Sequence, residues 1–209
     1  FFSNEMKIND VKFDQLSKFK SRDLLTGHCI VLVTPDGERT MNTHLGVTEN
    51  LSQDDLDIKI LKNCDWAYLE GYRFDGIDSQ KAFQIAIENV KLGGGNVALS
   101  LSDPFCVERH KRKFEDIINN GVDLVFCNEK ELISLTCEKN FNSALRKSLE
   151  FPSKFICTVA EKGVFINVEG SWINIPTKSV NIKDTTGAGD LFATGFLYCY
   201  LTGQNEELS

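Results

Sequence analysis

Short apolar segments alternate with longer amphipathic segments between about residues 65 and 159. The short segments predict buried strands at 66–69, 96–101, 123–127 and 154–159. Between them, apolar residues recur at helical spacing and predict helices capped at Ser79 and over 110–118, 129–135 and 142–149. Strands that alternate with helices favour a parallel sheet with both faces covered. We therefore expect an α/β fold with a doubly wound, mostly parallel sheet.

Two stretches break this alternation and predict hairpins. Residues 27–45 contain the apolar run CIVLV, an Asp36-Gly37 turn and a more polar returning strand. Residues 163–175 contain two extended runs that turn at Glu169-Gly170. Because the first hairpin precedes the repeating units, we expect it to be a small lid over a site or an edge of the sheet.

Composition narrows the functional classes. The 209 residues are enough for one core, and we expect a single domain over 1–209. The formal net charge of −7 argues against a nucleic-acid partner, since such binding depends on clustered Lys and Arg. No apolar run approaches the roughly 20 residues that a membrane span needs. Seven cysteines without a CxxC pair fit a reduced, cytoplasmic protein better than a disulfide framework or a zinc site.

The segment DTTGAGD at 184–190 leads directly into an apolar helix pattern. Small residues at 187–189 allow a tight turn and the close approach of a ligand to the backbone. The unpaired N–H groups of a helix start bind anions, and the carboxylate of Asp190 lies in the same turn. An ionised acid beside an anion site can orient a hydroxyl that attacks phosphorus. The segment thus favours phosphoryl transfer to an alcohol; an ordinary glycine-rich turn is the structural alternative.

This segment, with the following LFATGFLY, resembles the second signature of the ribokinase-like, or PfkB carbohydrate kinase, family, which includes ribokinase, fructokinases and adenosine kinase. The resemblance implies a ribokinase-like fold, ATP as phosphate donor and Asp190 as catalytic base. It also implies that the N–H groups of Gly187, Ala188 and Gly189 form an anion hole for the γ-phosphate. A P-loop kinase is disfavoured because GxxxxGK[ST] does not occur, and an NAD-dependent oxidoreductase because no GxGxxG follows an early strand.

A second motif, Asn128-Glu129-Lys130-Glu131, follows the strand predicted at 123–127. Ligands of open parallel sheets bind at this edge. The motif resembles the family's Asn-x-x-Glu, which implies that Asn128 serves the nucleotide site and that Glu131 holds Mg²⁺, largely through water. Mg²⁺ favours such ligation and neutralises a triphosphate. A helix capping box of Asn128 and Glu131 is the alternative, and both interpretations can hold together.

Two further matches to the family are partial. The segment TVAEKG lies where the family has Thr-x-Gly-x-x-Gly against the nucleotide, so Thr158 and Gly163 are candidate ATP contacts. Ala160 replaces the middle glycine, and a simple strand-to-hairpin turn explains the same residues. The resemblance also implies a loop that binds a monovalent cation such as K⁺. Asp184 and Thr186 are its candidate ligands in this sequence.

Three short segments resemble the adenosine kinase branch, namely Thr26–Cys29, Tyr68–Tyr72 and Ser102–Phe105. Arg39, on the returning strand of the lid, aligns with an arginine that reaches the phosphates in that branch. A solvated charge on an edge strand is the alternative for Arg39. The resemblance runs along essentially the whole chain, but the family is normally longer, so we expect this sequence to lack both ends and the residues that bind the acceptor.

The leading hypothesis is an ATP- and Mg²⁺-dependent kinase that phosphorylates a primary hydroxyl of a nucleoside, with adenosine as first candidate. One alternative is a fructose- or ribose-type sugar kinase of the same family. Another is a non-catalytic nucleotide-binding member or fragment. In each case the expected partner is a small molecule, and the protein is a monomer or, through an exposed edge at 30–33, a homodimer.

Overall fold

The computed structural model describes residues 2–12, 25–35, 39–182 and 184–203, and its main sheet has six strands in the order β3-β4-β5-β6-β7-β8. The strands are β3 (Trp66–Glu70), β4 (Asn96–Ser100), β5 (Leu124–Asn128), β6 (Lys154–Thr158), β7 (Val164–Val168) and β8 (Ser171–Ile175). The first four strands pair in parallel, whereas β7 pairs antiparallel with both β6 and β8. Spatial order thus follows chain order, and the carboxyl ends of β3 to β6 meet at one edge.

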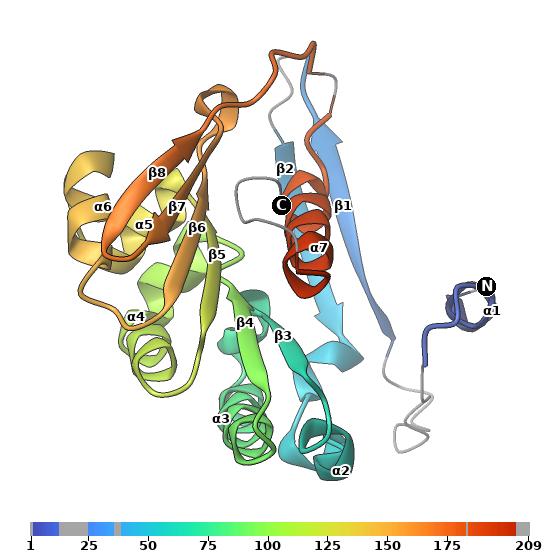
Figure 1. Cartoon of the computed structure of the whole chain (residues 1–209). Helices are drawn as coiled ribbons and strands as arrows, with labels where there is room; N and C mark the ends of the chain where they lie inside the picture. The colour runs from blue at the N-terminus through green and yellow to red at the C-terminus, as the bar shows by residue number, and fades with distance from the viewer. Residues whose placement is uncertain (1, 13–24, 36–38, 183, 204–209) are drawn as a thin grey trace.

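Helices cover both faces of this sheet, but unequally (Figure 1). One face carries α3 (Ile77–Leu92), α4 (Pro104–Asn119), α5 (Glu129–Thr136) and α6 (Phe141–Ser148). Their core includes the fully buried Phe114 and Phe155. The other face carries α7 (Ala188–Leu201), which packs through Ala193 and Phe196 onto β4, β5 and β6. The predicted mostly parallel α/β fold is confirmed.

Short elements complete the described chain. They are α1 (Phe2–Ile8), α2 (Ile58–Leu61), η1 (Val47–Asn50), η2 (Gln53–Asp55), η3 (Gly71–Asp75) and η4 (Ala160–Lys162). The η3 turn directly follows β3 and contributes the buried Phe74, which stacks on Phe114 with ring centroids 4.4 Å apart. This contact ties the carboxyl end of β3 to α4.

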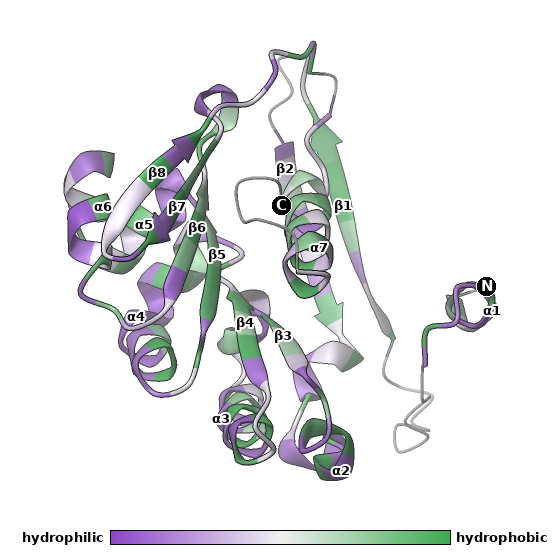
Figure 2. Cartoon of the chain, viewed as in Figure 1, coloured by the Kyte–Doolittle hydropathy of each residue, from purple (hydrophilic) through white to green (hydrophobic). Residues whose placement is uncertain are grey.

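Both predicted hairpins are present. The first, β1 (Thr26–Val33) with β2 (Arg39–Gly46), forms a separate antiparallel sheet, and its predicted Asp36-Gly37 turn lies outside the described residues. Figure 2 shows that β1 is hydrophobic along much of its length. In the second hairpin, Glu169 and Gly170 both have positive φ, as a two-residue turn between twisted strands requires.

Two helix starts differ from the sequence prediction. Ser79 is not a cap, because α3 begins at Ile77 after Gly76 and the Ser79 hydroxyl donates to the Leu51 carbonyl at 3.2 Å. The helix expected at 110–118 begins at Pro104, with the Asp103 carboxylate accepting from two backbone N–H groups. His110 interrupts it with φ −121° and ψ 20°. Because the predicted start at residue 110 coincides with this kink, the sequence pattern located only the second half of the helix.

Candidate active site

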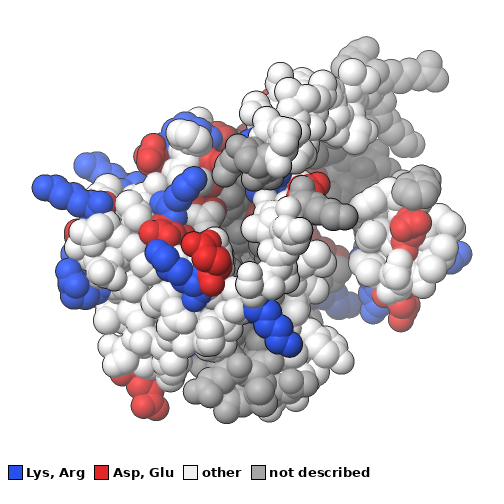
Figure 3. Space-filling model, turned by 90° about the horizontal axis from the view of Figure 1, so that it is seen from above, with Lys and Arg blue, Asp and Glu red and all other residues white. Residues whose placement is uncertain are grey.

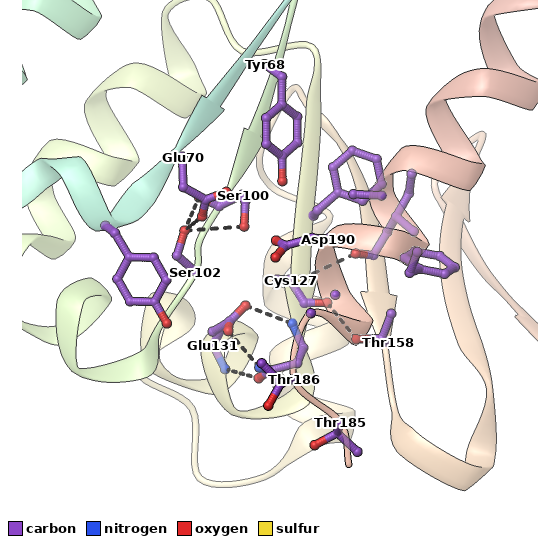
Figure 4. A pocket seen from close by; sticks show the side chains of 18 of the residues that line it. Tyr68, Glu70, Ser100, Ser102, Cys127, Glu131, Thr158, Thr185, Thr186 and Asp190 are labelled. Carbon is purple, nitrogen blue, oxygen red and sulfur yellow. Dashed lines mark hydrogen bonds between the residues drawn. The ribbon is translucent and has the colours of Figure 1, made fainter. Parts of the chain in front are cut away.

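A cavity of about 300 Å³ lies between the carboxyl ends of β3 to β6, the start of α7 and the hairpin strand β2 (Figure 4). Its wall includes most of the site residues expected from the sequence, which are Arg39, Asn128, Glu131, Thr158, Thr186, Gly187, Gly189 and Asp190. Three others, Gly163, Asp184 and Ala188, are not on the wall. Segments up to about 150 residues apart in the chain thus converge on one space, as the parallel topology predicts.

The start of α7 is open toward the cavity. Gly187 is its N-cap, with φ 74° and ψ 6°, and no side chain caps this end. The Ala188 N–H donates to the Thr185 carbonyl at 3.1 Å, whereas the N–H groups of Gly189 and Asp190 have no acceptor within the described part of the chain. Two unpaired donors at a positive dipole end are suited to bind an anion.

The glycine at 189 is not required by packing within the protein. A Cβ added there would meet nothing within 4 Å, and Gly189 lies on the cavity wall. Gly187 differs, because its φ of +74° is one that L side chains rarely adopt. Gly187 therefore shapes the turn, and the space beside Gly189 is open for a ligand.

Asp190 is exposed, and Figure 4 shows its carboxylate facing the cavity. Its backbone carbonyl accepts a hydrogen bond from the Thr194 hydroxyl at 2.7 Å. Among the described residues, nothing donates to its carboxylate or forms an ion pair with it. A carboxylate beside an anion-binding helix start is a suitable base for an incoming hydroxyl.

Asn128 and Glu131 form the capping box that was the structural alternative for their motif. The Asn128 backbone N–H and side-chain amide donate to the two oxygens of Glu131 at 2.9 and 2.6 Å. The Glu131 N–H donates to Asn128 Oδ1 at 2.9 Å. Both residues also line the cavity, so capping and ligand binding are compatible here.

Glu131 has an unusual electrostatic environment. Its side chain is almost completely buried, with the residue 6% exposed, and burial raises its pKa to about 7. Repulsion from Asp103 and Glu70 contributes to this raised pKa, and the hydrogen bond from Asn128 opposes it. A nearby cation would relieve this penalty, so the donor set fits a Mg²⁺ ion held through water. Among the described residues, no three His, Cys, Asp or Glu side chains converge as a direct metal cage.

Glu70 is a site residue that was not identified from the sequence. It ends β3 on the cavity wall and accepts a hydrogen bond from the Ser102 hydroxyl. Burial raises the pKa of Glu70, and the negative charge of Asp190 raises it further. Burial likewise raises the pKa of the neighbouring Tyr68 to about 12. Its position at the carboxyl end of a predicted parallel strand is the one signal in the sequence that could have identified it.

The remaining candidates occupy different settings. Thr158 lies on the wall, with its hydroxyl 3.5 Å from the Cys127 carbonyl. Arg39 is the single basic side chain among the described wall residues. Gly163 has φ 90°, and a Cβ there would lie 2.1 Å from the Ile175 carbonyl oxygen. The turn alone therefore accounts for glycine at 163, in agreement with the alternative of a simple strand-to-hairpin turn.

Asp184 and Thr186 contact each other. Asp184 Oδ1 accepts from the Thr186 N–H at 2.8 Å and from its hydroxyl at 2.7 Å. These bonds lower the pKa of Asp184. The pair holds an ionised oxygen next to the turn that leads into α7.

The face seen in Figure 3 carries no single basic track over the described residues. On the face seen in Figure 3, basic and acidic side chains are interspersed over the described residues. Within the described chain, no helix has both the length and the apolar character that crossing a bilayer demands.

Comparison with known proteins places these features in a family. The chain is similar to an adenosine kinase of known structure from Sinorhizobium meliloti, at 30% identity and a TM-score of 0.91, covering 99% of this chain and 63% of that one. A probable sugar kinase from Rhizobium etli CFN 42 matches at 31% identity and a TM-score of 0.90, covering 99% and 62%.

An uncharacterised sugar kinase of Archaeoglobus fulgidus is 25% identical over 193 residues, which are 87% of this chain and 71% of that protein. The chain thus spans less than two thirds of the two solved structures. The model of the pfkB family of carbohydrate kinases matches residues 1–208. This chain is therefore a member of the pfkB carbohydrate kinase family.

Proposed function

We propose that the protein transfers the γ-phosphate of Mg·ATP to a primary hydroxyl of a nucleoside, with adenosine as first candidate. The observation that carries this proposal is the exposed carboxylate of Asp190 beside the uncapped start of α7, on the wall of a cavity. An anion site and a base occupy the same helix turn, which is the arrangement that phosphoryl transfer to an alcohol needs.

In the proposed reaction, Asp190 accepts the proton of the attacking hydroxyl. The N–H groups of Gly189 and Asp190, at the positive end of α7, stabilise negative charge on the transferring phosphoryl group. Arg39 adds a positive charge from the β2 side of the cavity wall. Asn128 and Thr158 line the part of the cavity where the strand ends would contact the nucleotide.

Through water, Glu131 would hold Mg²⁺, which would supply positive charge against the phosphates. The buried carboxylate then changes from an isolated charge to a paired one. Asp184 and Thr186 are the residues that would serve a monovalent cation such as K⁺, close to the turn before α7.

The acceptor would lie between Asp190 and the end of β3. Asp190, Glu70 and Tyr68 line the cavity and also an adjoining one of about 540 Å³ between β3 and α7. Two carboxylates at this junction suit an acceptor with more than one hydroxyl, since each can accept one hydrogen bond. A ribose ring meets that requirement, with Asp190 at the reacting hydroxyl and Glu70 at a second one.

The segment Ser102–Phe105 favours a nucleoside over a free sugar because it resembles the adenosine kinase branch. Its first residue, Ser102, lines the cavity. The identities to an adenosine kinase and to a probable sugar kinase are nearly equal, so they do not separate the two acceptors. A fructose- or ribose-type sugar kinase is therefore the second candidate, and a non-catalytic nucleotide-binding protein the third.

The test is an acceptor panel with the full-length protein, in which ADP release is measured with ATP and Mg²⁺. We expect the highest kcat/KM with adenosine, lower values with other nucleosides, and little turnover of ribose or fructose. Faster turnover of a sugar would replace the nucleoside proposal with the sugar kinase. Nucleotide binding by calorimetry without ADP release on any acceptor would contradict both.

A further inference from the structure

Ser102 occupies a backbone position where serine is costly. It lies between β4 and Asp103, the N-cap of α4, and its φ is +66°. The left-handed region costs an L-residue about 1 kcal/mol or more, whereas glycine adopts it freely. Glycine would therefore serve this turn at least as well, and the turn alone does not account for serine.

The Ser102 hydroxyl has a partner that the turn does not need. It donates to Glu70 Oε1 on the neighbouring strand β3, and it lies 3.3 Å from the hydroxyl of Ser100. Figure 4 shows these three side chains together on the cavity wall, across the open space from Asp190. Ser102 thus combines a strained backbone conformation with a hydrogen bond to a residue of the cavity wall. Strained residues of this kind are common at functional sites.

We propose that Ser102 is a positioning residue, whose hydroxyl keeps the Glu70 carboxylate ionised and oriented toward the acceptor. The inference rests on the proposed function, in which Glu70 accepts a hydrogen bond from a second hydroxyl of the acceptor. Ser102 does not need to touch the acceptor, since it acts through Glu70.

The charges around Glu70 explain why such a donor is needed. Asp190 faces it from α7, Tyr68 lies on its own strand, and Glu131 and Tyr72 are close enough to sense its charge. Burial and repulsion from Asp190 raise the pKa of Glu70, while hydrogen bonds from Ser102, Ser100 and Tyr68 lower it. Loss of the Ser102 donor would therefore raise this pKa further.

The decisive variants are Ser102→Gly and Ser102→Thr in the full-length protein. Ser102→Gly keeps the backbone conformation and removes the hydroxyl, so we expect an equal or higher unfolding temperature. Its kcat/KM for the acceptor should fall about tenfold, and the acidic limb of the pH profile should move to higher pH. Ser102→Thr keeps a hydroxyl, so it should restore the wild-type limb despite lower stability.

Ser134→Ala is the matched control. Ser134 also donates from its hydroxyl to a glutamate, Glu108, at 3.4 Å, but on the exposed surface away from the cavity. This variant should leave both the pH profile and kcat/KM unchanged. KM for ATP should stay constant in all three variants, because the proposed effect is on the acceptor.

A second measurement does not depend on turnover. The Glu70 carboxyl carbon can be titrated by NMR in wild type and Ser102→Gly, with the expected pKa higher in the variant. If the two titrations coincide and the Ser102→Gly pH profile equals that of wild type, the positioning role is refuted. If the titrations differ but no acceptor is phosphorylated by wild type, the proposed function fails while the role of Ser102 toward Glu70 stands.

Discussion

The two helix starts on the cavity wall, those of α5 and α7, satisfy their first turns in opposite ways. At α5, three hydrogen bonds join Asn128 and Glu131 and close the turn: each residue's backbone N–H donates to the other's side chain, and the Asn128 amide donates to the Glu131 carboxylate. At α7, glycine is the N-cap, no side chain caps the first turn, and two of its N–H groups have no acceptor among the described residues. The closed start holds a buried charge in place, whereas the open start leaves its donors for a ligand. The absence of a cap at α7 is what the proposed phosphate site requires.

The largest expected effect comes from the acid in the open turn. Asp190→Asn removes the base but keeps the size of the side chain, so kcat should fall roughly 100- to 10,000-fold with little change in KM for ATP. Glu129→Gln is the matched change in the first turn of α5, since Glu129 lies outside the cavity wall, and it should stay near wild type. Near-normal turnover by Asp190→Asn in a steady-state ADP assay would remove the basis of the proposal.

The next effect concerns the buried acid of the closed turn. Because the pKa of Glu131 is raised in the folded state, its contribution to stability is complete below about pH 4.5 and is lost as pH rises through about 7. This contribution is about 3 kcal/mol at most. Urea unfolding of wild type between pH 4.5 and 8 should show the loss, and Glu131→Gln should abolish this part of the slope. Mg·ATP should reduce the slope as well, and an unchanged slope in the variant would assign it to other groups.

A smaller effect distinguishes ligand space from helix packing within α7. Gly189→Ala adds a methyl group to open space on the cavity wall, so it should lower kcat/KM for ATP about tenfold while stability stays equal or rises by up to about 1 kcal/mol. Gly195→Ala, in the same helix and also with nothing within 4 Å of an added Cβ, is off the cavity wall and should gain stability alone. Equal kinetics of the two variants would argue against a ligand beside Gly189.

The smallest effect compares two asparagine caps. Asn128→Ala and Asn140→Ala each remove an N-cap side chain, at α5 and α6, and each should lower the free energy of unfolding by about 1 kcal/mol. Only Asn128 lies on the cavity wall, so only its loss should also reduce kcat/KM for ATP. If thermal unfolding and kinetics change together in both variants, the kinetic effect is one of stability.

The sequence allowed the fold and one half of the site to be predicted. Strand and helix periodicity located β3 to β8 to within about a residue at each end, and the glycine-rich segment located the start of α7. Local hydrogen-bonding choices were not predictable, as at Ser79, whose hydroxyl binds the distant Leu51 carbonyl. Glu70 was missed for a similar reason, since its role depends on α7 and the β4–α4 turn, which no local pattern places beside it.

The hairpin β1–β2 shares no strand pairing with the main sheet, yet it supplies Arg39 to a wall on which Glu70, Glu131 and Asp190 are all acidic. The balance of charge in the cavity is therefore a property of how the hairpin docks, not of the sheet alone. Whatever shifts that docking changes both access to the cavity and its attraction for a polyphosphate in a single step. A substitution in the hairpin away from Arg39 would thus weaken the proposed nucleotide binding while leaving the stability of the main-sheet core unchanged.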